Sequence, residues 1–153
     1  MLTLDLFVHL DAVDRNAWQG APDERPLTDV GREQAGAMAR TLSASPVDAL
    51  YSSVALRCRA SMEPLAARTG LPVTVLPTFQ DTADKALAVV EEIRAHYPDG
   101  RVVICSYGDV IPAVLAVLAQ RWHVEPPPRD NRKGVVFRVE YGTGIELREP
   151  GAA

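Results

Sequence analysis

The residues best suited to chemistry lie in two short segments, near positions 9 and 107. His9 follows an apolar stretch and precedes Asp11, and Tyr107 follows a second apolar stretch and precedes Asp109. A neutral imidazole can act as a nucleophile or a base near neutral pH, and a tyrosine or a carboxylic acid can donate a proton. If the fold brings the two segments together, the sequence predicts a site for nucleophilic or acid–base chemistry.

Each of these residues also has a purely structural interpretation. A histidine at the end of a strand is often satisfied by neighbouring backbone groups, and a tyrosine can be an aromatic residue at a pocket rim. An aspartate in a loop commonly accepts hydrogen bonds from nearby backbone amides. The residue types alone therefore leave both interpretations open.

Periodicity indicates the elements that position these residues. Alternating or continuous apolar runs predict strands over residues 2–10, 47–51, 71–76, 101–106, 135–141 and 145–148. Helical spacing predicts helices over residues 28–43, 53–69, 82–97 and 110–121. Thr28 and Ser53 are placed to cap the first two helices, and Gly70 to end the second.

Strands that alternate with helices predict an α/β fold, a three-layer α/β/α sandwich with a mainly parallel central sheet. The 153 residues suit a single domain over residues 1–153, long enough to bury its own core. Ligands of such sheets bind beyond the carboxyl ends of the strands. His9 and Tyr107 both follow such ends, so the pattern predicts that they share a site.

Composition excludes several classes of function. The net charge of −4 argues against a nucleic-acid interface, and no apolar run is long enough for a membrane span. The first residues lack the basic region of a secretory signal, so a cytoplasmic protein is expected. Cys58 and Cys105 lie in apolar patterns and are expected to be reduced core thiols, with a disulfide as the alternative. No zinc motif, glycine-rich nucleotide motif or other cofactor signal occurs, and nothing indicates the oligomeric state.

Five segments, in order, resemble the histidine phosphatase (phosphoglycerate-mutase-like) superfamily. The resemblance is to its small phosphohistidine-phosphatase-like branch and to the second domain of certain actinobacterial Nudix proteins, and it spans essentially the whole chain. The segments are Leu6–Ala12, Arg15–Ala35, Tyr51–Ser61, Cys105–Pro112 and Arg132–Gly134.

The resemblance implies roles for particular residues. It implies that His9 is the nucleophile that accepts a phosphoryl group, and that Arg57 is the phosphate-binding arginine of the Tyr51–Ser61 segment. It further implies that Arg15 and the helix start at Ser53 contribute to an anion-binding site and that Trp18 lies in a loop over that site. It also implies that Asp81 or Asp84 donates a proton. The expected ligand is a small, anionic molecule.

Two family positions differ in this chain. The family's Arg-His-Gly motif has Val8 in place of its arginine, and its Ser-His-Gly motif has Tyr107 in place of its histidine. A hydrogen bond to a charged group contributes about 1.5–3 kcal/mol. Two losses would weaken phosphate binding by a factor of about 10²–10⁴.

Three hypotheses follow. The first is a divergent phosphohydrolase that acts on a small phosphate ester or nucleotide through a phosphohistidine at His9. The second is a repurposed enzyme that uses His9 with Tyr107, Asp11 or Asp109 as acid–base groups on a substrate without phosphate. The third is a catalytically inactive binding module that keeps the scaffold.

Overall fold

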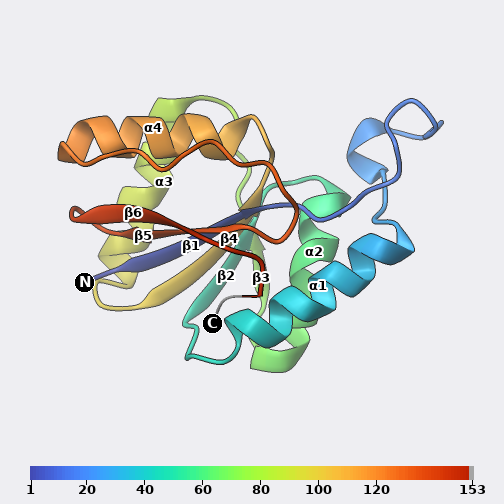
Figure 1. The fold of residues 1–153 in the computed structure, drawn as a ribbon, viewed down its shortest axis with the longest axis horizontal. Coiled ribbons are helices and arrows are strands. Elements are labelled where there is room, and N and C mark those ends of the chain that lie inside the picture. Colours follow the sequence, from blue (N-terminus) through green and yellow to red (C-terminus); the bar gives the residue numbers. More distant parts are fainter. Residues whose placement is uncertain (152–153) are drawn as a thin grey trace.

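A central six-stranded sheet, covered by helices on both faces, forms the body of the protein (Figure 1). The computed structural model describes residues 1–151. The strand order is β3-β2-β4-β1-β5-β6, in which β1 to β4 are parallel and β5 is antiparallel to both of its neighbours, β1 and β6. The strands are β1 (Thr3–Val8), β2 (Ala49–Ser52), β3 (Val73–Val75), β4 (Arg101–Ser106), β5 (Val136–Glu140) and β6 (Gly144–Arg148).

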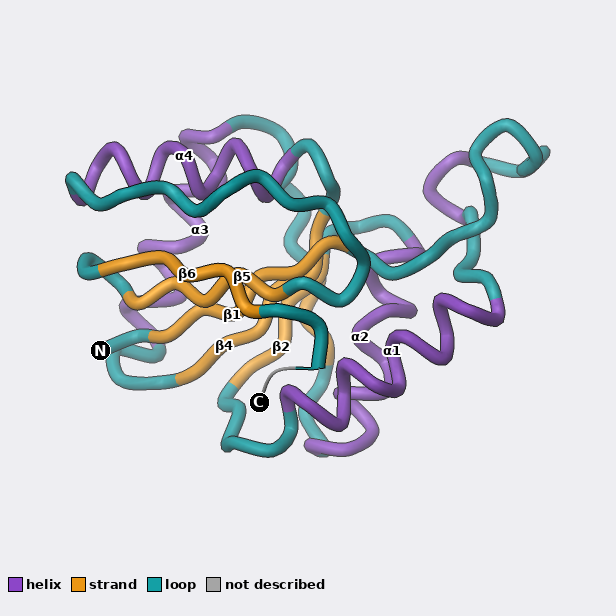
Figure 2. Tube along the Cα trace, viewed as in Figure 1, coloured by secondary structure: helices purple, strands orange, loops and turns teal. Residues whose placement is uncertain are grey.

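Four α-helices form the outer two layers. Two of them, α3 and α4, lie on one face of the sheet, and α1 and α2 lie on the other (Figure 2). The predicted three-layer α/β/α sandwich is therefore confirmed. The helices are α1 (Asp29–Leu42), α2 (Leu56–Thr69), α3 (Ala83–His96), α4 (Val110–Trp122) and the short 3-10 helix η1 (Pro22–Glu24).

Local signals explain where the helices begin and end. The hydroxyl of Thr28 accepts a hydrogen bond from the Gly31 amide at the start of α1, and Gly70 ends α2 in the left-handed conformation, both as predicted. The prediction that Ser53 caps α2 is wrong. The helix begins after Ala55, which provides no side-chain cap, because Ser53 is drawn into the core, where its hydroxyl bonds to that of Ser106 at 2.8 Å.

The buried strands carry apolar side chains to both faces. Along β1, Leu4, Leu6 and Val8 pack beneath α3 and α4, whereas Phe7 packs beneath α1 and α2. Cys58 and Cys105 are both buried and free, as expected of reduced core thiols.

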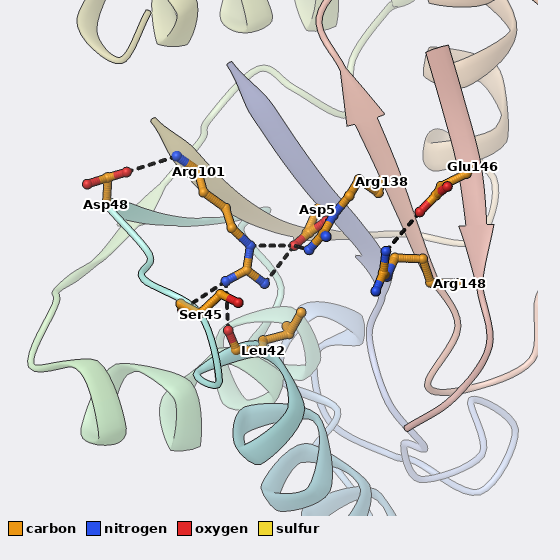
Figure 3. A network of polar contacts seen from close by, with 8 residues as sticks. All are labelled: Asp5, Leu42, Ser45, Asp48, Arg101, Arg138, Glu146 and Arg148. Carbon is orange, nitrogen blue, oxygen red and sulfur yellow. Dashed lines mark hydrogen bonds and ion pairs between the residues drawn. The ribbon is translucent and has the colours of Figure 1, made fainter. Parts of the chain in front are cut away.

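One buried acid interrupts this apolar sheet. Asp5 in β1 has no exposed surface, and its carboxylate accepts hydrogen bonds from Nε of Arg101 at 2.9 Å and from Nε and Nη2 of Arg138 at 2.8 Å (Figure 3). Arg101 also donates to the carbonyls of Leu42 and Ser45. This network ties β1, β4 and β5 to the end of α1.

The parallel register of β1 and β4 brings the segments that contain His9 and Tyr107 together. Val8 pairs with Ser106, and the His9 amide donates to the Ser106 carbonyl at 3.0 Å. His9 and Tyr107 thus leave neighbouring strands at the same edge of the sheet. The loop between β1 and α1, which contains η1, extends away from the sheet at this edge (Figure 1).

Candidate active site

A large open cavity lies at the carboxyl ends of β1 and β4. Its volume is about 1010 Å³, and its wall includes Val8, His9, Tyr107 and Gly108. The loop between β1 and α1, the start of α2 and the segment before β5 complete the wall. This is the position at which open α/β sheets bind ligands.

His9 lies in the wall with one ring nitrogen already engaged. Its Nδ1 is 2.9 Å from the carbonyl oxygen of Leu10. A carbonyl can only accept, so Nδ1 carries the proton and the neutral ring keeps a lone pair on Nε2. Burial, followed by the positive charge of Lys133, lowers the pKa of His9 to about 4. The imidazole is therefore neutral at physiological pH, the form that a nucleophile needs.

Arg57, in the first turn of α2, also lines the cavity. Its Nη1 donates to the carbonyl of Pro22 at 3.3 Å, and its guanidinium lies 4.9 Å from the ring centre of Tyr107. Its Nε is buried and has no hydrogen-bond partner among residues 1–151. Unsatisfied buried donors are uncommon and often mark functional sites. Arg57 is thus fixed by its neighbours yet keeps donors for a ligand.

Tyr107 lines the cavity and also supports the backbone at the start of α2. Its hydroxyl accepts a hydrogen bond from the amide of Ala55, just before α2, at 3.1 Å. Burial raises its pKa above the usual value, so the phenol stays protonated. One of the free amides at the start of α2 is thereby satisfied by a side chain.

Three further cations, Lys133, Arg25 and Arg129, line the cavity, and the sequence analysis did not place them among the site residues. Lys133 Nζ donates to the carbonyl of His9 at 2.7 Å, and Arg25 Nη1 donates to the carbonyl of Val13 at 2.6 Å. The basic turn Arg132–Gly134 was the only signal for Lys133. Arg25 lies in the Arg15–Ala35 segment that resembles the family, but that resemblance gave it no role.

The predicted site residues divide into two groups. Six of them line the cavity: His9, Asp11, Arg15, Arg57, Tyr107 and Asp109. Three are not in its wall. Ser53 is fully buried against Ser106, Trp18 donates to the carbonyl of Ala21 within its own loop, and Asp81 pairs with Lys85 on α3 at 3.2 Å. Gln80, the neighbour of Asp81, reaches the wall instead.

The carboxylates of the wall are Asp11, Asp14, Asp23 and Asp109. Asp11 accepts a hydrogen bond from the hydroxyl of Thr28 at 2.7 Å, which ties the segment after His9 to the start of α1. At the same junction, a side chain on Gly31 would lie only 1.9 Å from the carbonyl oxygen of Asp11. This close approach holds the segment behind the imidazole against α1.

Residues 1–151 contain no cluster of three or more histidine, cysteine, aspartate or glutamate side chains that could hold a metal ion. Across the same residues, none of the helices is long and apolar enough to cross a membrane.

Comparison with known proteins identifies relatives of the chain. Residues 11–83 match the family model of the histidine phosphatase superfamily, branch 1. The chain is 30% identical over 139 residues to an 8-oxo-(d)GTP phosphatase of Mycolicibacterium smegmatis; the match covers 89% of this chain but only 43% of that protein. The chain thus spans less than half the length of this curated relative.

Solved structures share the fold at low sequence identity. A mycobacterial glucosyl-3-phosphoglycerate phosphatase with inorganic phosphate has a TM-score of 0.71 at 21% identity, covering 95% of this chain and 94% of that one. YhfR of Bacillus stearothermophilus has a TM-score of 0.74 at 19% identity, covering 100% and 98%. The protein histidine phosphatase SixA with tungstate has a TM-score of 0.69 at 18% identity, covering 96% and 94%. Part of the chain, residues 11–83, thus matches the histidine phosphatase superfamily model, and the whole chain shares the architecture of these solved structures.

Proposed function

We propose that this protein is a phosphohydrolase that acts on a small phosphate ester or nucleotide through a phosphohistidine at His9. The observation that carries the proposal is the state of the imidazole. Nδ1 is fixed by the Leu10 carbonyl and the ring is neutral, so Nε2 is free to attack, while Arg57 lies in the same cavity wall. The nucleotide part of the proposal is supported by the mycobacterial relative, which is an 8-oxo-(d)GTP phosphatase.

The reaction consists of two displacements at phosphorus. The lone pair of Nε2 forms a bond to phosphorus, the bond from phosphorus to the leaving oxygen breaks, and that oxygen takes up a proton. Water then attacks the phosphohistidine, which releases inorganic phosphate, restores the neutral imidazole and gives up a proton. Cationic side chains in the cavity stabilise the negative charge on the equatorial oxygens in both steps.

The proton donor for the leaving oxygen is a separate part of the proposal. Asp81 is the donor implied by the family resemblance, but it pairs with Lys85 outside the cavity wall. Asp11 is engaged by Thr28, whereas Asp109 is exposed and lines the cavity beside Tyr107. We therefore assign this role to Asp109 in place of Asp81.

A trapping experiment tests the proposal. The protein is mixed with acyl, nucleotide and sugar phosphates labelled in the transferred group, then quenched and assayed for acid-labile, base-stable label. We expect label on the wild type and none on His9→Gln. The chain has three histidines, so His96→Gln and His123→Gln are matched controls that should retain it. Failure to label with every donor, or label that survives His9→Gln, would overturn the proposal.

A second candidate is acid–base catalysis on a substrate without phosphate. It is favoured by one observation: His9, Tyr107, Asp11 and Asp109 line the same cavity. This candidate predicts that phosphate and vanadate do not raise the melting temperature, because only ligands that bind the native state stabilise it. A clear rise with millimolar vanadate would favour the phosphohydrolase. An inactive binding module would show neither label nor turnover, and His9→Gln would preserve its biological role.

A further inference from the structure

The cations of the cavity are held by backbone carbonyls and not by carboxylates. Lys133 is tethered to the carbonyl of His9, Arg25 to that of Val13 and Arg57 to that of Pro22. Arg15 and Arg129 also line the wall. Within residues 1–151, none of these five side chains forms an ion pair. The charges of the three tethered cations are therefore fixed in place, and none of the five has a carboxylate of the described chain at close range.

These cations are close enough to repel one another. Burial first, and then the charges of Arg57 and Arg15, lower the pKa of Arg25. Lys133, Arg57 and Arg25 each act on the imidazole of His9, in decreasing order of strength, whereas Arg15 acts on Arg25. All four side chains also line the same cavity, so their positive charge is gathered around one space. Such an arrangement is unfavourable when empty and is relieved by an anion.

The acidic side chains of the wall offset this charge only from beyond ion-pair distance: the charge of Asp11 opposes the lowering of the Lys133 pKa, and that of Asp14 opposes the lowering of the Arg25 pKa. Asp11 is hydrogen-bonded to the Thr28 hydroxyl, and Asp14 accepts from the amide of Asn16 at 2.7 Å. Asp23 and Asp109 are exposed. None of these carboxylates comes within ion-pair distance of a cavity cation in the described chain.

The cavity wall carries more cations than one phosphoryl group requires. A phosphate monoester carries about −1.5 to −2 charges near pH 7. Lys133 and Arg57 suffice to balance it beside His9, which leaves Arg25 and Arg15 without a counterpart. The cavity volume of about 1010 Å³ also leaves room beyond a single phosphate, since small-molecule sites typically measure about 300–1,000 Å³.

We propose that the cavity binds a phosphate compound that carries a second anionic group next to the phosphate. Lys133 and Arg57 hold the phosphoryl group at His9, and Arg25 and Arg15 hold the second anion. The chemistry of that anion is either a second phosphate, as in a diphosphate, or a carboxylate close to the phosphate. The proposal rests on the proposed function for which end of the ligand reacts, but binding of the two anions does not depend on turnover.

Binding calorimetry with inorganic phosphate, pyrophosphate and phosphoglycolate tests the proposal. We expect pyrophosphate or phosphoglycolate to bind the wild type at least ~10-fold more tightly than phosphate, the effect of one charged hydrogen bond. Whichever binds more tightly identifies the second anion. Arg15→Met is the most informative variant, because Arg15 is exposed and its loss leaves the core intact. It should weaken the two-anion ligand by ~10-fold and phosphate by less than ~3-fold.

Companion variants separate charge from structure. Arg25→Met should have the same selective effect as Arg15→Met, and Arg25→Lys should restore most of the affinity for the two-anion ligand. Arg121→Met, in the last turn of α4 and outside the cavity wall, removes the same charge and should change nothing.

Two results would overturn the proposal. One is a wild type that binds phosphate as tightly as both two-anion ligands. The other is an equal loss of phosphate and two-anion affinity in Arg15→Met and Arg25→Met, because one anion site would then explain all binding. Selective binding of a two-anion ligand without any phosphohistidine would instead overturn the proposed function and leave this inference standing.

Discussion

Arginine serves opposite purposes in two regions of this protein. In the sheet, Arg101 and Arg138 converge on the fully buried carboxylate of Asp5 (Figure 3). In the cavity, Arg25 and Arg57 are held by carbonyls, Arg57 also by the ring of Tyr107, and neither has a carboxylate partner in the described chain. A guanidinium that already has its anion contributes to the fold, whereas one positioned without an anion is available to bind one. The partner of each arginine therefore indicates its role better than its degree of burial does.

The largest effect is expected from breaking the sheet network. Asp5→Ala leaves two arginines without their buried counter-ion, and removing one partner of a buried pair typically costs about 3–5 kcal/mol. Urea unfolding should show a loss of this size. Asp99→Ala, which breaks an exposed pair with the amino terminus, is the control and should cost little. A loss below about 1 kcal/mol for Asp5→Ala would show that the network is not structural.

The next effect concerns protons at His9. Its folded pKa of about 4 lies below the ordinary 6.5, so between these values the unfolded chain binds a proton that the folded chain does not. Stability is therefore unaffected by His9 above about pH 6.5 and falls as the pH is lowered toward 4, by roughly 3 kcal/mol. His9→Gln should unfold with a flatter pH dependence in that window. Parallel pH curves for the two proteins would contradict the low pKa.

Lys133→Met tests one specific cause of the low pKa of His9. The positive charge of Lys133 contributes to the low pKa of His9, so removing it should move the imidazole titration, followed by NMR, to higher pH. Arg121→Met should leave the titration unchanged. If Lys133→Met also leaves it unchanged, the charge of Lys133 does not reach the imidazole.

Arg57→Met should show the pattern opposite to that of Asp5→Ala. Loss of one charge-assisted contact to the phosphoryl group should lower kcat/KM by about 10–100-fold. Stability should change by less than about 1 kcal/mol, because no ion pair is broken and the methionine can still pack on Tyr107. Steady-state kinetics and urea unfolding on the same preparation check both parts. A large loss of stability would place Arg57 with the structural arginines.

The smallest effect is expected at Tyr107. Tyr107→Phe removes the acceptor for the Ala55 amide, which should cost about 1 kcal/mol of stability. Tyr107→His provides a comparison in which a ring nitrogen can still accept. Thermal unfolding distinguishes the two variants, and an unchanged melting temperature for Tyr107→Phe would indicate that water satisfies the amide instead.

The architecture could be predicted from the sequence because its signals are local. Each signal depends only on residues close by in the sequence: the apolar runs, the capping hydroxyl of Thr28 and the turn at Gly70. Together these local elements imply the layers. The same logic placed His9 and Tyr107 at one edge, since parallel strands bring their carboxyl ends together. Ser53 shows the limit of this reasoning, because a distant hydroxyl on β4 competed with its helix for the side chain.

The cavity cations were harder to predict because their positions depend on long-range contacts. Lys133 reaches a carbonyl that lies 124 residues earlier in the chain, and no periodic pattern records such a contact. Arg25 is fixed by a loop whose course depends on the packing of α1. Trp18 and Asp81 failed to reach the wall for the converse reason: a nearby carbonyl and a nearby lysine engage them first.

The contact between α1 and Asp11 means that a substitution at Gly31, outside the cavity wall, would displace the segment that follows His9. Gly31 faces no ligand, yet any larger residue there would push away the Asp11 carbonyl, to which the Thr28 amide donates. A random-mutagenesis screen for altered substrate preference should therefore recover changes throughout the cavity wall and almost none at residue 31. Attempts to adapt the scaffold to new substrates would have to leave that glycine untouched.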